Sequence, residues 1–229
     1  MQDLATKLMD ELDSKTCFTI HAFGGIPVSN SIVVTWGIMA FLMILTLIFV
    51  RNLKMVPDKP QIVVETIVGF INNFFLDILG EHGKRYVPYL GTVMLYLVCS
   101  NIIGLFGFTP PTKDLNVTAG LAIMSIILIE YSGVHAKGVK GWLKSFAEPM
   151  PIMAPINFLE IFIRPLSLCM RLFGNILGGF VVMELLKIIV PAIVPIPFSL
   201  YFDIFDGIIQ AYVFVFLTSL FMQEKMESE

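Results

Sequence analysis

Long apolar segments dominate this chain and restrict what it can fold into. The first of them, residues 31–50, has about the 20 residues that a helix needs to cross the hydrocarbon core of a bilayer. Hydrophobic residues make up 56% of the chain and charged residues only 14%, whereas soluble domains carry about 25% charged residues. The sequence therefore predicts an integral membrane protein made of several helices.

Helical periodicity and turn residues divide the chain into an N-terminal segment, residues 1–30, and a single membrane domain, residues 31–229. The N-terminal segment is acidic and lacks the basic start and nearby apolar core of a cleavable signal, so we expect the first helix to remain as an anchor. The predicted fold class is an all-α membrane protein. Its predicted helices are 31–50, 61–79, 86–108, 117–133, 155–190 and 198–222.

Two of these helices differ from simple membrane spans. In residues 61–79, apolar residues recur at helical spacing with Glu65 and Asp77 between them, which predicts an amphipathic helix on the membrane surface. Residues 155–190 would form a helix about 54 Å long, which exceeds a hydrocarbon core of about 30 Å. That helix must tilt or kink, and Pro165 permits either.

Basic residues mark the segments expected on the cytoplasmic side. They follow the first span and recur in a loop predicted after residue 133. By the positive-inside rule these segments are cytoplasmic, which places the N-terminus outside and the polar C-terminal tail in the cytoplasm. These basic residues are Arg51, Lys54, Lys59, Lys137, Lys140 and Lys144.

Arg171 lies inside the apolar helix predicted for residues 155–190. Arginine keeps its proton in proteins, and holding it at bilayer depth costs about 2.5–3.5 kcal/mol on insertion scales. Because apolar residues extend about two turns or more to each side of it, Arg171 marks an ion pathway or a counter-ion site, and a snorkelling position near a helix end fits less well. Ser167, Asn175 and Gly178 share its stripe of the helix, which predicts a surface that receives another helix closely.

Two other charges belong to the same predicted helix. Arg164 lies near the stripe of Arg171 but precedes Pro165, and we expect it to extend to the headgroups at the membrane surface. Glu184 points to roughly the opposite side of the helix from Arg171. It either lines a separate aqueous path or pairs with Lys187 at an interface.

The last predicted helix carries Asp203, Asp206 and Gln210 at i, i+3 and i+7, which places them on one face. Two close carboxylates in a partly dehydrated site can exchange protons near neutral pH. Asp203, near the helix start, also fits an exposed residue favoured by the helix dipole. Gln210 needs a hydrogen-bond partner in its apolar surroundings, and we expect Arg171 or Asn175 to supply it.

The sequence contains no recognisable reaction centre. Its three cysteines and three histidines are scattered, so no disulfide framework, metal or cofactor is expected. The net charge of −3 gives no reason to expect a nucleic-acid partner, and no nucleophile–base pair emerges. Charges inside a membrane without a catalytic centre favour ion translocation. The alternative is a stand-alone secondary ion transporter with Arg171, Glu184 and Asp203 as a relay, against which stands the lack of an inverted repeat.

Several short motifs can be compared with known families. They are Arg164-Pro-Leu-Ser-Leu-Cys-Met-Arg171-Leu-Phe-Gly-Asn175, Gly178-Gly179, Gln210-Ala-Tyr-Val-Phe, Asn101-Ile-Ile-Gly, Pro111-Thr-Lys-Asp-Leu-Asn116 and Val56-Pro. Together they resemble subunit a of the F-type ATP synthases. The motifs around Arg171 and Gln210 are the most specific, and the resemblance extends from about the first span to the C-terminus.

The resemblance implies a membrane-embedded stator subunit of the ATP synthase Fo part. It implies one N-terminal span, a surface helix, a hairpin, and two long tilted helices that pack on a ring of c subunits. Arg171 would face the ring carboxylates, and two offset half-channels would carry protons or sodium ions to and from the ring. The residues expected in ion translocation are Arg171, Asn175, Gln210, Glu184, Asp203, Asp206 and Ser167.

The same resemblance implies partners and a location. The partners would be the c-ring, the b subunits of the peripheral stalk, the lipid bilayer and, indirectly, the F1 ATPase, on which synthesis takes place. The location would be the plasma membrane of a bacterium. The chain departs from many bacterial relatives at Phe180, where they have a glutamate that lines the outer half-channel. Glu184, one turn on, is expected to take over that role, and Asp203 keeps a titratable group where relatives have Glu or His.

Overall fold

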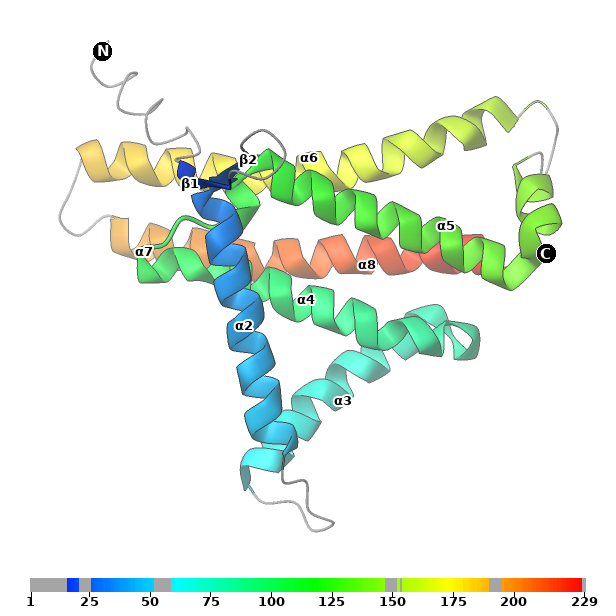
Figure 1. The fold of residues 1–229 in the computed structure, drawn as a ribbon, viewed down its shortest axis with the longest axis horizontal. Helices are drawn as coiled ribbons and strands as arrows, with labels where there is room; N and C mark the ends of the chain where they lie inside the picture. The colour runs from blue at the N-terminus through cyan, green and yellow to red at the C-terminus, as the bar shows by residue number, and fades with distance from the viewer. Residues whose placement is uncertain are drawn as a thin grey trace.

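The computed structural model describes residues 16–20, 26–51, 59–146, 152, 154–189 and 195–227. Within these ranges, six helices are long and apolar enough to cross a membrane, which confirms the predicted all-α membrane fold. The long helices are α2 (Asn30–Val50), α3 (Lys59–Leu79), α4 (Val87–Ile102), α5 (Leu115–Ser145), α6 (Ala154–Ile189) and α8 (Gly207–Met226) (Figure 1).

Shorter elements connect the long helices. Three of them are 3₁₀ turns, one is a short α-helix and one is a π-helical segment that leads directly into α8. They are η1 (Glu81–Tyr86), η2 (Ile103–Phe106), η3 (Pro111–Lys113), α7 (Pro195–Ser199) and the π-helical η5 (Leu200–Asp206). The last predicted helix, 198–222, is therefore built from three consecutive helical pieces.

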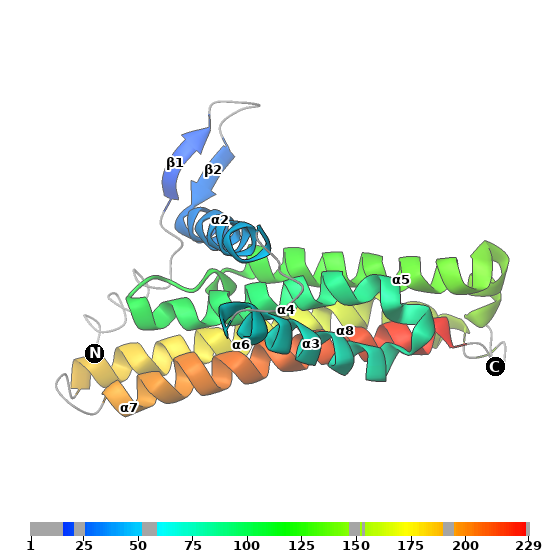
Figure 2. The same cartoon turned by 90° about the horizontal axis from the view of Figure 1, so that it is seen from below.

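Within the described residues, four long helices run side by side, and α3 packs its buried face against α4 and α8. Helices α4, α5, α6 and α8 run alongside one another in two perpendicular views, whereas α2 crosses them at a steep angle (Figures 1 and 2). Helix α5 packs against both α6 and α8, and α4 packs against α8. The largest fully buried side chains include Phe75, Leu90, Leu97, Ile129, Leu172, Val215 and Met222.

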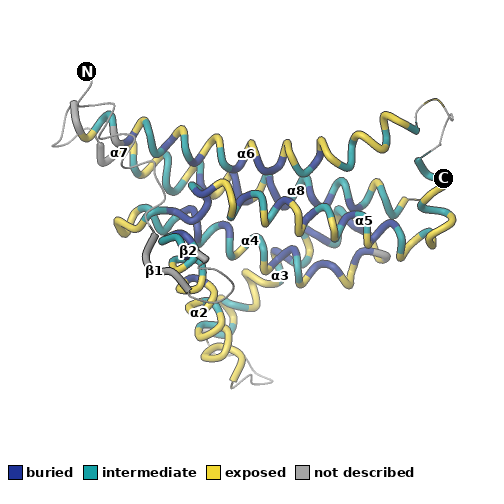
Figure 3. Tube along the Cα trace, turned by 45° about the horizontal axis from the view of Figure 1, so that its top comes forward, coloured by how far each residue is buried: buried dark blue, intermediate teal, exposed yellow. Residues whose placement is uncertain are grey.

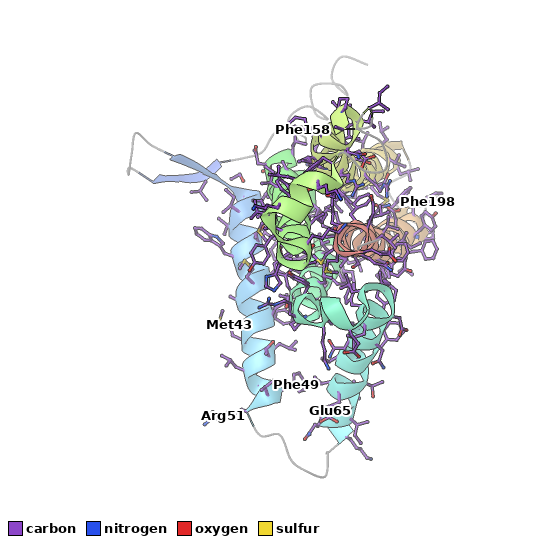
Figure 4. All side chains as sticks on the ribbon, turned by 90° about the vertical axis from the view of Figure 1, so that its right-hand side faces the viewer. Met43, Phe49, Arg51, Glu65, Phe158 and Phe198 are labelled. Atoms are coloured by element: carbon purple, nitrogen blue, oxygen red, sulfur yellow. The ribbon has the colours of Figure 1, made fainter. Side chains whose placement is uncertain are left out.

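Helix α2 contributes little to this core. It is apolar around its whole circumference, and its surface is largely exposed (Figure 3). Met43 and Phe49 are 65% and 38% exposed, and they lie on the part of α2 that extends away from the packed helices (Figure 4). A helix that is hydrophobic all round needs an apolar environment, which lipid supplies.

The N-terminal end of α2 is tied to the rest of the chain by a hairpin and a loop. Strand β1 (Thr16–Ile20) pairs antiparallel with β2 (Ile26–Ser29), with Thr16 opposite Ser29; the sequence had not predicted this hairpin. The Ser29 hydroxyl donates to Asp114 Oδ2 over 3.2 Å. Asp114 also accepts at Oδ1 from the Asn116 N–H over 3.0 Å, which caps α5.

Helix α3 exists as predicted, but its place relative to a membrane stays a prediction. Ile71, Phe75 and Leu79 are buried in the core, whereas Ile62 and Val63 are exposed. The helix is long and apolar enough to cross a membrane. Its one-sided burial is equally typical of an amphipathic surface helix.

Helix α5 is longer than the sequence predicted. It continues past residue 133 to Ser145, so the three lysines at 137, 140 and 144 lie on helix and the predicted loop is wrong. Gly138, with φ 72° and ψ 164°, interrupts the helix and turns its last two turns back. Trp142 then donates from Nε1 to Glu130 Oε2 over 2.7 Å. Tertiary contacts thus stabilise helical turns that hydropathy alone does not reveal.

Candidate functional site

Asn101, at the end of α4, joins three segments that are distant in sequence. Its Nδ2 donates to the carbonyl of Gly207 over 2.8 Å, and its Oδ1 accepts from the Thr112 hydroxyl over 2.9 Å. Asn101 is only 2% exposed. A Cβ on Gly207 would lie 2.9 Å from Asn101 Cβ, so glycine is required for α4 and α8 to approach this closely.

A cavity of about 300 Å³ lies beside this junction. Its walls come from the end of α4, the loop between η2 and η3, the second half of α6, and the α7–η5 segment. The volume is sufficient for several water molecules. The polar side chains that line it are Asn101, Thr109, Asn175, Lys187, Ser199, Asp203 and Asp206.

Asp203 and Asp206 both line this cavity, as their predicted shared face requires. The Ser199 hydroxyl donates to Asp203 Oδ2 over 2.6 Å. On the other side, a Cβ on Gly104 would come within 2.9 Å of Asp203 Oδ1. Asp203 is therefore held between a hydroxyl donor and the closely approaching backbone of η2, and the alternative of a freely exposed residue does not hold.

Gln210 is separated from the two carboxylates. It is 7% exposed and does not line the cavity. A face shared by Asp203, Asp206 and Gln210 requires α-helical spacing, but residues 200–206 are π-helical, with hydrogen bonds from i to i+5. The wider turn changes which residues share a face. Gln210 consequently lies inward on α8.

The residues predicted on one stripe of α6 are all exposed. Ser167, Arg171, Asn175 and Gly178 lie on the outer surface of the helix, and nothing lies within 4 Å of a Cβ placed on Gly178. Exposed apolar residues also occur on α6 and on the η5–α8 segment. They include Leu166, Met170, Val182, Tyr201, Phe205 and Ile208.

Asn175 connects the exposed stripe to the cavity. Its side chain lies on the outer face one turn from Arg171 and also lines the cavity with Asp203 and Asp206. In the described part of the chain, no hydrogen bond joins Gln210 to Arg171 or Asn175, because Gln210 is turned inward while the other two face outward. The predicted Gln210 contact is therefore not observed.

Comparison with known proteins identifies the family. The family model for the ATP synthase A chain matches residues 32–223. This chain belongs to the ATP synthase subunit a family. The chain is 37% identical over 215 residues to "ATP synthase subunit a, sodium ion specific" of Propionigenium modestum, covering 87% of this chain and 74% of that protein. It is 34% identical over 200 residues to ATP synthase subunit a of Moorella thermoacetica, covering 87% of this chain and 91% of that protein.

The family context draws attention to Phe180 on α6. Phe180 lines the cavity, and Lys113 Nζ lies 3.6 Å from the centroid of its ring. This cation–π contact occurs at the position where we expect the chain to depart from many bacterial relatives. Glu184 follows one turn later on α6, but its side chain lies outside the described part of the chain. Lys187, one turn further, lines the cavity.

The structure overturns the expectation for Arg164. Instead of extending to headgroups, Arg164 is buried, 9% exposed. Its Nη2 bonds Glu160 Oε2 over 2.5 Å and Glu224 Oε1 over 2.7 Å, and its guanidinium lies 4.7 Å from the ring centroid of Phe221. Two carboxylates and an aromatic face replace the solvent that a buried cation loses.

Several residues of the site were missed by the sequence argument. Ser199 has no signal in the sequence, and Gly104 and Thr112 lie in motifs that resemble the family without any role being expected for them; their partners alone give them one. Asn101 had a signal of its own, because a polar amide within an apolar helix requires a hydrogen-bond partner. Within the described ranges, no group of three or more His, Cys, Asp or Glu side chains is arranged to hold a metal ion.

Proposed function

We propose that this chain is the ion-translocating stator subunit of an F-type ATP synthase and that Arg171 faces the carboxylates of a c-ring. One observation carries the proposal: Arg171 is exposed on a surface of small and apolar residues of α6, whereas Arg164 on the same helix is buried. An unpaired surface of this kind is suited to a rotating apolar partner. Membership of the subunit a family supports that partner being the c-ring.

The electrostatics of the proposed mechanism follow from the fixed charge. A ring carboxylate that carries its ion is neutral and can face lipid. Beside the Arg171 guanidinium the anionic form is stabilised, so the ion leaves. After reloading from a second path, the neutral carboxylate turns away. The arginine, which stays charged, also repels cations that would otherwise leak straight across.

The cavity is the proposed outer half-channel. Asp203 and Asp206 would pass ions along it, and Asn175 would connect it to the stripe that contains Arg171; each lines the cavity. Glu184 is proposed to supply a further carboxylate, and Gln210 and Ser167 to support the helix surface near Arg171. Each elementary charge that crosses 100 mV gains about 2.3 kcal/mol, so several ions are needed for each ATP made on the F1 ATPase.

The proposed partners and orientation follow from the same assignment. The b subunits of the peripheral stalk hold the chain against the ring in the plasma membrane of a bacterium. Residues 1–30 lie outside and the C-terminus lies in the cytoplasm, in agreement with the positive-inside rule. A stand-alone secondary transporter is not favoured, because the family to which the chain belongs consists of subunits of a complex.

The test uses inverted membrane vesicles that contain the whole complex with the wild-type chain or with Arg171→Ala. ATP-driven uptake is measured with a pH-sensitive dye and with ²²Na⁺, since one relative is named sodium ion specific. We expect Arg171→Ala to abolish uptake of whichever ion the wild type pumps, with the complex still assembled. Arg51→Ala is the matched control, because Arg51 is an exposed arginine at the end of α2. Normal pumping by Arg171→Ala would overturn the proposal.

A further inference from the structure

Two adjacent residues at the end of α8 form ion pairs with two different helices. Glu224 pairs with Arg164 of α6, and Lys225 pairs with Glu130 of α5. We name these four residues, Glu130, Arg164, Glu224 and Lys225, the clasp. None of them belongs to the cavity or to the exposed stripe that contains Arg171.

The contact between α8 and α6 centres on a buried cation. The Arg164 side chain is 10% exposed, while those of Glu160 and Glu224 are 39% and 59% exposed. Its Nη2 makes both carboxylate contacts, and its buried Nη1 has no hydrogen-bond partner in the described part of the chain. Removing Glu224 would therefore leave a buried charge with a single carboxylate, on its own helix.

The contact between α8 and α5 is equally enclosed. Lys225 Nζ lies 3.8 Å from Glu130 Oε1, and the two side chains are 13% and 17% exposed. Lys225 also lies 4.6 Å from the ring centroid of Phe146, and Trp142 donates to the other oxygen of Glu130. The turned-back end of α5 thus encloses the Lys225–Glu130 pair and fixes the end of α8.

The clasp contacts α6 next to Pro165, where the helix can bend. Pro165 follows Arg164 directly and lies inside the helix, where it removes a backbone hydrogen bond and permits bending. Arg171 lies seven residues after Arg164, about 10 Å along the helix axis. A small change of direction at Pro165 would therefore move Arg171 relative to anything that packs on the exposed face of α6.

We infer that the clasp positions Arg171 against the ring, with Arg164 and Glu224 as positioning residues. The inference rests on the proposed function. When the clasp is broken, α6 bends at Pro165 and Arg171 no longer stays close enough to every passing ring carboxylate. Ions then cross without rotation, or rotation occurs without ions, and the number of ions pumped for each ATP hydrolysed falls.

The experiment measures that ratio in inverted vesicles containing the whole complex. The variants are Arg164→Gln, Glu224→Gln and the conservative Arg164→Lys, compared at equal amounts of assembled complex. We expect each of the two Gln variants to lower the ratio by about twofold or more, the low end of the coupling between contacting charged residues. Arg164→Lys, which keeps a cation beside both carboxylates, should retain most of the ratio. Glu227→Gln is the matched control, because Glu227 is exposed and lies just after α8.

The outcomes separate this inference from the proposed function. Arg171→Ala is measured in the same vesicles. If Arg171→Ala abolishes pumping while both Gln variants of the clasp keep the wild-type ratio, the clasp inference is overturned and the proposed function stands. If Arg171→Ala pumps normally, the proposed function itself fails. If Arg164→Gln does not assemble, Glu224→Gln decides: a lowered ratio in the assembled complex supports positioning, and the wild-type ratio overturns it.

Discussion

The side-chain amide of Asn101 donates a hydrogen bond to the carbonyl of Gly207, 106 residues later in the chain. This bond lies where η5 passes into α8, beside the cavity that contains Asp203 and Asp206. The same side chain accepts from Thr112. Asn101 therefore fixes the start of α8 and the η3 turn relative to the end of α4, and with them the buried wall of the cavity.

Replacing Asn101 with Ala should destabilise the protein. The Thr112 hydroxyl and the Gly207 carbonyl would both lose their partner in a buried place, at a cost of about 1–3 kcal/mol for each unsatisfied group. Thermal unfolding of the purified chain in detergent measures the effect. Thr112→Val, which removes only one of the two bonds, should cost less, and Asn116→Ala at an exposed position should change little. Equal stability of Asn101→Ala and wild type would contradict this account.

Gly104→Ala should disturb ion transport through a direct clash. The added methyl group would lie 2.9 Å from Asp203 Oδ1 and push the carboxylate aside. We expect transport to fall by about tenfold, equivalent to about 1.4 kcal/mol in the barrier. Gly120→Ala is the control, because nothing lies within 4 Å of a Cβ at that position. Similar transport rates in the two variants would show that the position of Asp203 is not critical.

Asp203→Asn should lower transport more than Ser199→Ala. The first change removes the titratable group, and positioned proton-transfer groups contribute about 10²- to 10⁴-fold. The second removes only a hydrogen bond to that group, worth about 1.5–3 kcal/mol where the acceptor is charged. ATP-driven ion uptake in vesicles measures both. A Ser199→Ala complex slower than Asp203→Asn would assign the main role to the hydroxyl.

Phe180→Glu should be tolerated and should make transport depend on Lys113. The new carboxylate would stand where the ring now lies 3.6 Å from Lys113 Nζ, so an ion pair replaces a cation–π contact worth about 0.5–2 kcal/mol. A double-mutant cycle with Lys113→Met measures the coupling. We expect Lys113→Met to have a larger effect on transport in the Phe180→Glu background than in wild type. Additive effects would rule out the pairing.

Gly138→Ala should destabilise the end of α5. At φ 72° and ψ 164° only glycine adopts the backbone conformation without strain, and another residue is destabilised there by about 1–3 kcal/mol. The strain would release the turns that carry Trp142 and Phe146, so limited proteolysis near residue 138 should become faster. Gly120→Ala, within regular helix, is expected to be neutral or slightly stabilising. Unchanged proteolysis in Gly138→Ala would mean that this turn is not maintained by its glycine.

Local composition and periodicity were sufficient for much of the fold. Apolar length predicted the helices, and the stripe of Ser167, Arg171 and Asn175 was correct because α6 stays a continuous helix through Pro165. The same reasoning failed for Gln210, because one π-helical stretch changes the angular spacing that the argument assumed. Hydropathy also predicted that α5 ends at residue 133, because the turns after Gly138 are polar. They are stabilised instead by the hydrogen bond from Trp142 to Glu130.

What the sequence by itself determined is the set of apolar helices and the exposed charge on α6, because both depend on neighbours within a few turns. The tertiary structure alone decided which polar groups meet. From the sequence, Arg164 is expected at the membrane surface, but it is buried against Glu224, sixty residues later. Asp203 lies against the backbone of Gly104, which belongs to η2. Contacts over such separations depend on how whole helices pack, and no local pattern encodes that packing.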